Sequence, residues 1–346
     1  MSTSTFKAVI LAGGSGERFW PLSTPERPKQ FLRVFGGASL IRQAVSRLDG
    51  LVLPKNVFVV TAKNLVVATQ KELPEIPKCN ILGEPMRRDT GAAVALGVGL
   101  AAESAADPVI GFFSSDQMVA NPKAFRKVVS KAVAIAHRKQ VIVTLGIKPT
   151  YPATCFGYIS PKTRTFVEKP DAKKAKKYVK AGYLWNAGMF IARASTFRGA
   201  FAAHAPELER LTRLETDGTN RTDGTRSRST AIAGGSLAKL YSALPKISFD
   251  YAVMEKSKNV EVVPGDFGWD DVGSFAAFDK YFPHDSRGNV REGPCTVVEA
   301  DGNICVARSA RISLLGVRNL VVVTTPDAVL VADKSRLTDM KKLFKR

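Results

Sequence analysis

The feature that most constrains the fold is the alternation of short apolar runs with helical patterns in the first half of the chain. The predicted strands are Lys7–Ala12, Val57–Ala62, Asn80–Gly83, Val109–Phe113 and Val141–Leu145, and the predicted helices are Ser39–Leu48, Gly91–Ala106 and Pro122–His137. Strand–helix alternation favours βαβ units and a mostly parallel sheet. The strands are almost wholly apolar, as expected when helices bury both faces of the sheet. Ligands of such sheets bind at the carboxyl ends of the strands, so the loops there are the first candidates for a site.

The rest of the chain changes character twice. With 346 residues it is long enough for two domains. The middle, from about Tyr151 to Phe282, mixes strands with other elements and contains a hydrophilic stretch, Thr216 to Thr230, typical of a surface loop. From Thr296 onward, short strands separated by turn residues predict a small all-β domain, which a terminal helix from Ser335 closes. We therefore expect an α/β domain over residues 1–282 and a small β domain over 283–346.

The net charge of +20 suits an anionic partner, which could be nucleic acid, an acidic membrane or a phosphorylated substrate, or it serves solubility alone. No apolar stretch approaches the ~20 residues of a membrane helix, and Ala8 to Ala12 is too short for the core of a signal peptide. The four cysteines form no metal-binding spacing, which favours reduced thiols and a cytoplasmic protein. The lysines of one predicted helix, Lys173 to Lys180, are best interpreted as a solvated face without nucleic-acid binding.

A glycine-rich loop directly follows the first strand. It comprises Leu11, Ala12, Gly13, Gly14, Ser15 and Gly16, and is followed by Glu17, Arg18 and, further on, Pro28-Lys29. Glycines let backbone N–H groups approach a phosphate closely, and arginine and lysine supply the opposite charge. The pattern is neither a P-loop nor a dinucleotide fingerprint. A simple turn is the alternative, but the basic residues at this spacing favour phosphate binding.

Carboxylates follow two distant apolar segments. Asp116 ends the run Phe112-Phe113-Ser114-Ser115, and the pair Asp270-Asp271 precedes Val272-Gly273. Magnesium commonly takes one or two carboxylates and completes its shell with water and phosphate oxygens. Each aspartate alone could equally be a helix cap or a turn residue. Beside a phosphate loop, Asp116 and one aspartate of the pair predict a Mg²⁺ site.

Two further strand ends carry polar side chains. Glu168-Lys169 precedes Pro170, so the lysine could neutralise a phosphate while the glutamate accepts hydroxyl hydrogen bonds. Asn186 follows Trp185 and offers an amide beside an aromatic wall. An exposed ion pair and a strand-end turn are equally good interpretations of these residues taken alone.

Taken together, these segments resemble the sugar-1-phosphate nucleotidylyltransferases, and most closely those that act on mannose 1-phosphate and GTP. The matching stretches are AVILAGGSGERFWPLS, RPKQFL, GEPMRRDT, FFSSDQ, FVEKP, WNAGMF, FDYAVMEK, GWDDVGS and, near the end, LLGVRNLVVVTTPDAVLVADKSR. They occur in the family's order along nearly the whole chain. The resemblance implies a Rossmann-like, glycosyltransferase-A-like mixed sheet flanked by helices, followed by a β-helix-like domain. It also implies that too little chain follows Phe282 for the cupin-type isomerase domain that some relatives append.

The resemblance also implies a reaction: mannose 1-phosphate and GTP give GDP-mannose and pyrophosphate with Mg²⁺, by in-line attack without a covalent enzyme intermediate. Nucleotide-binding roles are implied for Leu11, Ala12, Gly13, Gly14, Ser15, Gly16, Glu84 and Thr90, and phosphate-handling catalytic roles for Arg18, Lys29 and Lys169. Sugar-binding roles fall on Gly157, Glu168 and Asn186, and metal-binding roles on Asp116 and Asp271. Neither nucleic acid nor a membrane is an implied partner, and a homodimer stays open.

Four positions depart from the family's usual pattern. Glu17 replaces a small hydroxyl residue, Asp89 an asparagine, Gln117 a histidine, and Cys155-Phe156 a Gly-Tyr pair. These departures keep two alternatives open: the same reaction with another sugar phosphate or nucleotide, and a catalytically silent, regulatory subunit that binds nucleotide sugars.

Overall fold

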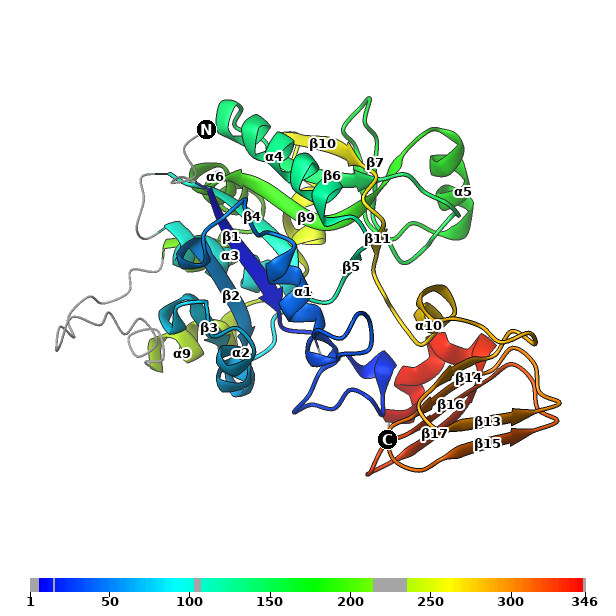
Figure 1. Cartoon of the computed structure of the whole chain (residues 1–346). Helices are drawn as coiled ribbons and strands as arrows, with labels where there is room; N and C mark the ends of the chain where they lie inside the picture. The colour runs from blue at the N-terminus through cyan, green and yellow to red at the C-terminus, as the bar shows by residue number, and fades with distance from the viewer. Residues whose placement is uncertain (1–5, 15, 103–106, 214–234, 345–346) are drawn as a thin grey trace. The chain divides into compact units, whose positions relative to one another are not determined.

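The structure is a computed structural model that describes residues 6–14, 16–102, 107–213 and 235–344 (Figure 1). The chain forms two compact units, each made of discontinuous segments. Unit 1 comprises residues 1–13, 44–115 and 119–269, and unit 2 comprises residues 14–43, 116–118 and 270–346. The predicted loop from Thr216 to Thr230 and the predicted nucleotide-binding Ser15 lie outside the described residues. The domain boundary after Phe282 stays a prediction.

Unit 1 is built on a nine-stranded mixed sheet whose main path runs β10-β6-β9-β4-β1-β2-β3. These strands are β1 (Phe6–Ala12), β2 (Val57–Ala62), β3 (Ile81–Glu84), β4 (Val109–Ser114), β6 (Ile142–Ile147), β9 (Leu184–Arg193) and β10 (Val260–Gly265). The short strands β7 (Tyr158–Ile159) and β8 (Phe166–Val167) join at β9. β1 pairs in parallel with β2 and β4, and β2 with β3, whereas β9 is antiparallel to both β4 and β6. The sheet is therefore mixed, as predicted.

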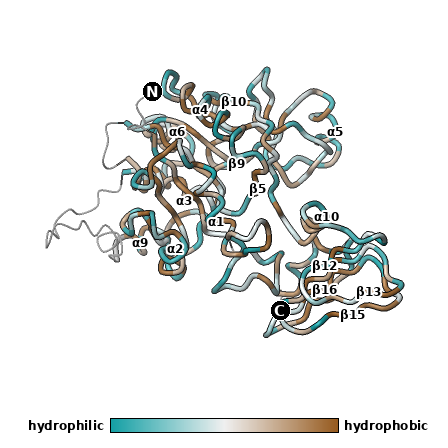
Figure 2. Tube along the Cα trace, viewed as in Figure 1, coloured by the Kyte–Doolittle hydropathy of each residue, from teal (hydrophilic) through white to brown (hydrophobic). Residues whose placement is uncertain are grey.

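Unit 1 also contains helices, and those over residues 66–72, 89–102, 122–138 and 194–204 pack against this sheet. The helices are α2 (Val66–Glu72), α3 (Asp89–Ala102), α4 (Pro122–Arg138), α5 (Ala172–Lys180), α6 (Ala194–His204), α7 (Pro206–Glu209) and α9 (Gly235–Ala243), with a π-helical turn η7 (Asp250–Met254) and 3₁₀ turns η3 (Pro54–Asn56), η4 (Lys63–Leu65), η5 (Lys78–Asn80) and η6 (Arg210–Arg213). In α3 every residue from Gly91 to Ala102 is buried, so this helix is apolar all round (Figure 2). The lysines of α5 at 173, 176, 177 and 180 are exposed, which confirms a solvated face.

Unit 2 combines the segment after the first glycines with the end of the chain. It contains η1 (Glu17–Phe19), η2 (Lys29–Phe31), α10 (Ala276–Tyr281), η8 (Lys334–Phe344) and strands β12 (Val290–Glu292), β13 (Cys295–Val298), β14 (Ile304–Ala307), β15 (Ile312–Leu315), β16 (Leu320–Thr324) and β17 (Val329–Asp333). Three short elements span the unit limits in sequence: α1 (Leu40–Ser46), β5 (Met118–Val119) and β11 (Trp269–Asp270). Phe19 packs on Phe275 with ring centroids 5.4 Å apart, so the early segment shares the core of this unit.

The strands of the C-terminal region stack in parallel, as expected of a β-helix-like domain. β12 pairs with β14 and β14 with β16, while β13 pairs with β15. Buried asparagines link successive turns, because Asn303 Nδ2 donates to Asn289 Oδ1 at 2.9 Å and Asn289 Nδ2 donates to the Ala300 carbonyl at 2.8 Å. β17 returns antiparallel to β16 and ends the stack.

Among the described residues, none of the helices combines the length and the apolar character needed to cross a bilayer.

Candidate active site

A cavity of about 490 Å³ lies at the carboxyl ends of β1, β2 and β3, where ligands of parallel sheets bind. Its lining residues are Gly13, Ala62, Lys63, Asn64, Glu84, Pro85, Met86 and Arg87. Two glycines shape it. A Cβ atom at Gly13 would lie 3.3 Å from Glu84 Oε2, and one at Gly83 would lie 2.7 Å from the Cα of Lys63. Glycine at position 83 thus lets β3 pass close to the backbone that follows β2.

Glu84 is the one carboxylate among the residues that line this cavity, and it is only 8% exposed. The hydroxyl of Tyr241, a fully buried residue of α9, donates to Glu84 Oε1 at 3.2 Å. Burial raises the pKa of Glu84 to about 7, although the Tyr241 hydrogen bond works against the rise. Such a carboxylate gains strongly from a ligand that supplies N–H donors.

The segment after Glu84 is held by its own side chains. Arg88 donates from Nε to the carbonyl of Tyr241 at 2.7 Å and from Nη2 to that of Ser242 at 2.8 Å. Thr90 Oγ1 accepts a hydrogen bond from the N–H of Phe249 at 3.0 Å. Thr90, a predicted nucleotide-binding residue, therefore already ties this segment to the residue that precedes η7.

The three predicted sugar-binding residues lie together in unit 1. A Cβ atom built at Gly157 would lie 2.5 Å from Glu168 Oε2 and 3.5 Å from Asn186 Cβ. The N–H of Asn186 donates to the Gly157 carbonyl at 2.8 Å. Glycine at position 157 thus leaves room for the Glu168 carboxylate, which is 9% exposed.

Two acidic residues that the sequence analysis left without a role complete this cluster. Asp250 Oδ1 accepts from Asn186 Nδ2 at 2.9 Å, and Glu255 Oε1 accepts from the backbone N–H of Glu168 at 2.7 Å. Asp250 begins the π-helical turn η7, and Glu255 directly follows it. In the sequence, the one sign of these two residues was a carboxylate on each side of a short apolar run. On its other side, Asn186 Oδ1 accepts from Thr144 Oγ1 at 2.7 Å and from the Gly188 N–H at 3.1 Å.

Lys169 is the cation of this cluster. Its Nζ lies 3.0 Å from Glu168 Oε1, and its side chain is 53% exposed. Burial lowers the pKa of Lys169, but the hydrogen bond and the charge of Glu168 outweigh this effect and raise it. Burial and the charge of Glu168 together raise the pKa of Asp250 to about 7, and burial also raises the pKa of Glu168. The raised pKa keeps Lys169 protonated, and the raised pKa values of Glu168 and Asp250 favour their neutral forms. Lys169 can therefore still attract an anionic group.

The predicted phosphate and metal residues of unit 2 form a second cluster. Lys29 is 5% exposed, and its Nζ donates to Asp116 Oδ2 and to the carbonyl of Asp271, each at 2.9 Å. A Cβ atom at Gly273 would lie 3.1 Å from both Arg18 Nη1 and Asp271 Oδ2. The structure therefore brings Arg18, Lys29, Asp116 and Asp271 together.

The glycine-rich loop passes from one unit to the other. Leu11, Ala12 and Gly13 belong to unit 1, whereas Gly14 and Gly16 belong to unit 2. Gly16 has a φ of +67°, and a Cβ atom there would lie 2.6 Å from the backbone nitrogen of Lys29. Gly14 is exposed, as are Glu17 and Arg18.

Asp116 and Asp271 fit the donor set of a magnesium ion. Burial raises the pKa of Asp271, and the neighbouring Asp116 charge adds to the rise, while Lys29 and Arg18 lower it. Mutual repulsion of two carboxylates at one place is what a divalent cation relieves. In the part of the chain that the structure describes, no cluster of three or more His, Cys, Asp or Glu side chains could hold a metal. These two aspartates would therefore leave most of the coordination shell to water and phosphate oxygens.

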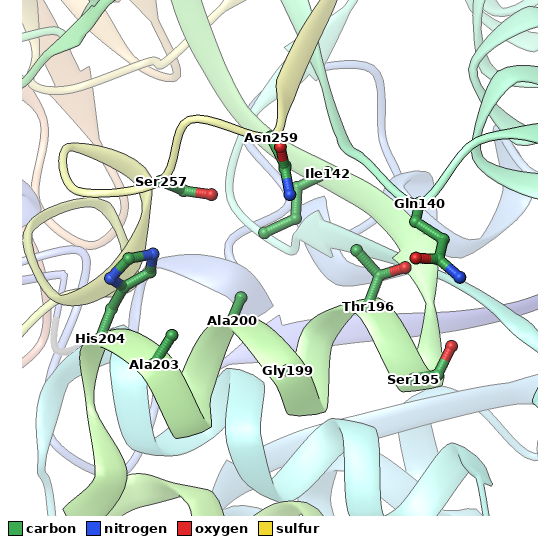
Figure 3. A pocket seen from close by; sticks show the side chains of 10 residues that line it. All are labelled: Gln140, Ile142, Ser195, Thr196, Gly199, Ala200, Ala203, His204, Ser257 and Asn259. Atoms are coloured by element: carbon green, nitrogen blue, oxygen red, sulfur yellow. The ribbon is translucent and has the colours of Figure 1, made fainter.

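A second cavity of about 260 Å³ lies beside α6 (Figure 3). Its lining residues are Gln140, Ile142, Ser195, Thr196, Gly199, Ala200, Ala203, His204, Ser257 and Asn259. None of the residues predicted for the site is among them, so the predicted chemistry has no counterpart there.

Comparisons with known proteins show the family to which the chain belongs. Residues 7–287 match the nucleotidyl transferase family, and residues 293–346 match the mannose-phosphate isomerase/GMP-like β-helix domain. Two proteins named mannose-1-phosphate guanylyltransferase are each 33% identical: one from Escherichia coli K12, over all of this chain and 74% of the relative, and one from Klebsiella pneumoniae, over 96% and 72%. A crystal structure described as a mannose-1-phosphate geranyltransferase from Thermus thermophilus shares 34% identity and covers 99% of both chains, with a TM-score of 0.85. The chain belongs to the nucleotidyl transferase family and carries the β-helix domain of the mannose-phosphate enzymes at its end.

Proposed function

We propose that this protein is a mannose-1-phosphate guanylyltransferase, which converts mannose 1-phosphate and GTP into GDP-mannose and pyrophosphate. The observation that carries the proposal is the similarity, over nearly all of this chain and about three-quarters of each relative, to proteins that bear this name. An oxygen of the sugar phosphate attacks the α-phosphorus of GTP. The bond from that phosphorus to the bridging oxygen of the β-phosphate breaks, and pyrophosphate leaves with the electron pair.

The nucleotide base binds in the cavity at the ends of β1, β2 and β3. Guanine presents N1–H and N2–H₂ on one edge, whereas adenine has an acceptor at N1. The carboxylate of Glu84 accepts hydrogen bonds from the guanine edge and leaves adenine with an unpaired, buried acceptor beside it. The backbone of Leu11, Ala12 and Gly13 leads from this cavity into the glycine-rich loop with Gly14, Ser15 and Gly16, which we assign to the triphosphate.

The sugar phosphate binds at the cluster of Gly157, Glu168 and Asn186. Glu168 accepts hydrogen bonds from sugar hydroxyls, and Asn186, held by Asp250 and Thr144, offers the remaining hydrogen of its amide. Lys169 neutralises the phosphate of the sugar, because its charged end is half-exposed and beside the hydroxyl-binding glutamate.

Charge on the reacting phosphates is neutralised by Arg18 and Lys29. Asp116 and Asp271 are the residues that would hold Mg²⁺, because Lys29 Nζ contacts the Asp116 carboxylate and the backbone carbonyl of Asp271 and so keeps the two residues close together. When bound there, the ion supplies positive charge to the phosphate oxygens of the nucleotide. Catalysis of this kind depends on positioning and charge, and it needs no nucleophile from the protein.

A substrate matrix tests the proposal. GTP, ATP, UTP, CTP and dTTP are each incubated with mannose 1-phosphate, glucose 1-phosphate and other sugar phosphates, with and without Mg²⁺, and pyrophosphate release is measured. We expect the highest kcat/KM for GTP with mannose 1-phosphate, and loss of turnover when Mg²⁺ is removed. A maximum at another pair would assign another member of the same reaction class. Binding of GDP-mannose without turnover of any pair would identify a regulatory subunit.

The partners that follow are GTP, mannose 1-phosphate, GDP-mannose and pyrophosphate, with neither nucleic acid nor a membrane among them. We assign the protein to the cytoplasm, where its four cysteine thiols would stay reduced. Whether two copies form a homodimer is measured by light scattering.

A further inference from the structure

The base-binding carboxylate has a partner from a distant part of the sequence. Tyr241 lies in α9, 157 residues after Glu84, and its side chain is fully buried. Its hydroxyl donates to Oε1 of Glu84, whereas Oε2 is the oxygen closest to the position of a Cβ at Gly13, a lining residue of the cavity. The two oxygens of one carboxylate therefore face different surroundings: one faces the protein and the other the cavity.

From this division we propose that Tyr241 is a positioning residue for base recognition, and that its hydroxyl fixes the orientation of the Glu84 carboxylate for the N–H donors of guanine. The inference rests on the proposed function and assigns to it a residue outside the motifs that pointed to the family. A carboxylate rotates about its terminal torsion with little preference, so its orientation is set by its hydrogen bonds. The Tyr241 bond supplies that restraint from the side opposite the cavity.

The helix that carries Tyr241 is itself locked to the base-binding segment. Arg88 spans the carbonyls of Tyr241 and Ser242 at the end of α9 with two hydrogen bonds, at 2.7 and 2.8 Å. Arginine is suited to this contact because its planar fork can reach two acceptors at once. Glu84 and Arg88 thus hold the same turn of α9 from both ends of one five-residue segment. The arginine of this segment positions α9 in the structure.

The charges around Glu84 explain why its hydrogen-bond donor is the neutral hydroxyl of Tyr241. Burial raises the pKa of Glu84, the Tyr241 hydrogen bond lowers it, and the charge of Asp89 adds to the rise, while Lys63 and Arg87 line the same cavity. A neutral donor favours the ionised form of the Glu84 carboxylate without pairing it with a positive charge. The charge then remains available to the ligand.

Tyr241→Phe tests this role, because it keeps the ring and removes only the hydroxyl. We expect KM for GTP to rise about tenfold, with little change in kcat or in KM for mannose 1-phosphate. The preference for GTP over ITP, which lacks the N2 amino group, should fall with it. Without its donor, Glu84 has a higher pKa, so the fall of kcat/KM for GTP on the acid side should move to higher pH.

Tyr183→Phe is the matched control, since Tyr183 lies in unit 1 and stacks on Tyr178, and neither tyrosine is among the residues that line the cavity. It should leave KM for GTP, the ITP ratio and the acid limb unchanged. Arg88→Lys is a second route to the same readout. A lysine cannot span both carbonyls, so the GTP/ITP preference should fall in the same direction but less.

GDP titration, followed calorimetrically, separates this inference from the proposed reaction. If Tyr241→Phe binds GDP as tightly as the wild-type chain and keeps its GTP/ITP ratio and acid limb, the positioning role is wrong, whatever the wild-type turnover. If the wild-type chain turns over no GTP but binds GDP with the expected Tyr241 dependence, the positioning role holds and the proposed reaction fails. A Tyr241→Phe protein that weakens both substrates equally at an unchanged acid limb would also overturn the inference, since that result indicates a purely structural role.

Discussion

Unit 1 buries two glutamates to a similar extent, but the two carboxylates have different partners. Glu84 and Glu168 are 8% and 9% exposed, and burial raises the pKa of both. Glu84 is held by a neutral tyrosine hydroxyl, whereas Glu168 lies 3.0 Å from the ammonium of Lys169. When it is ionised, the carboxylate with the neutral partner has no cation beside it and can accept hydrogen bonds from a ligand that donates them. The carboxylate with the cation belongs to the site that we propose for the anionic sugar phosphate.

The difference teaches that partner type, more than burial, indicates which half of the reaction a carboxylate serves. The edge of guanine is neutral and rich in N–H donors, so it binds best to a carboxylate that has no cation beside it. A sugar phosphate combines hydroxyl groups with two negative charges, so it needs an acceptor and a cation side by side. The two sites that we propose in unit 1 match these two requirements.

Removal of the cation tests the comparison most severely. Lys169→Ala leaves the carboxylates of Glu168, Asp250 and Glu255 together without their lysine. We expect kcat/KM for mannose 1-phosphate to fall on the order of 10²–10³-fold, with KM for GTP changed far less. Lys173→Ala, on the exposed face of α5, is the control and should change neither. An equal loss for both substrates would contradict the assignment of Lys169 to the sugar phosphate.

Neutralising the other glutamate should act on the nucleotide alone. Glu84→Gln replaces one acceptor oxygen by an NH₂ donor, which opposes the N–H groups of guanine. The expected result is a fall of about 10–100-fold in the ratio of kcat/KM for GTP to that for ATP, with mannose 1-phosphate saturating. Glu207→Gln, exposed on α7, should keep the wild-type ratio. Unchanged discrimination in Glu84→Gln would place base selection elsewhere.

How far the sequence predicts these two sites follows from where their residues lie. Glu84, Glu168 and Lys169 stand at or directly after the ends of predicted strands, and for such residues strand topology alone brings neighbours together. Tyr241 and Asp250 could not be found in that way. They reach their glutamate and asparagine partners across 157 and 64 residues, and an apolar pattern shows which face of a helix is buried but not which distant residue it meets.

The fold shows the same limit. Strand–helix alternation predicts the parallel core of β1, β2, β3 and β4, and the structure confirms it. The packing of Phe19 on Phe275 is not predictable from local pattern, because it joins segments far apart in the chain whose apolar spacing is short and irregular. The division of the glycine-rich loop between the two compact units likewise depends on contacts between distant segments.

A methyl group at the sugar site tests whether space around Glu168 matters. In Gly157→Ala the new Cβ would lie 2.5 Å from Glu168 Oε2, so the carboxylate must move. We expect KM for mannose 1-phosphate to rise about tenfold, without an effect on the GTP/ATP ratio. Gly199→Ala is the matched control, because nothing lies within 4 Å of a Cβ there. A wild-type KM in Gly157→Ala would show that Glu168 needs no fixed position.

The smallest expected effect concerns pH and stability at the site with the lysine. Asp250 has a folded-state pKa of about 7 against an ordinary value of 3.8, so the folded chain holds a proton there that the unfolded chain has already released. The stability that this proton contributes is complete below about pH 4 and is lost as the pH rises toward 7. Asp250→Asn removes the titration and keeps a carbonyl oxygen for Asn186 Nδ2. We therefore expect its Tm, relative to that of the wild-type chain, to increase by a few degrees between pH 4 and pH 8, measured by calorimetry in buffers of equal ionic strength.

Asp171→Asn, at an exposed N-cap where a backbone hydrogen bond lowers the carboxyl pKa, should produce the opposite trend at the acid end of that range. A Tm difference between Asp250→Asn and wild type that stays constant from pH 4 to pH 8 would show that Asp250 is ionised throughout, and that Lys169 then balances the charges of both Glu168 and Asp250.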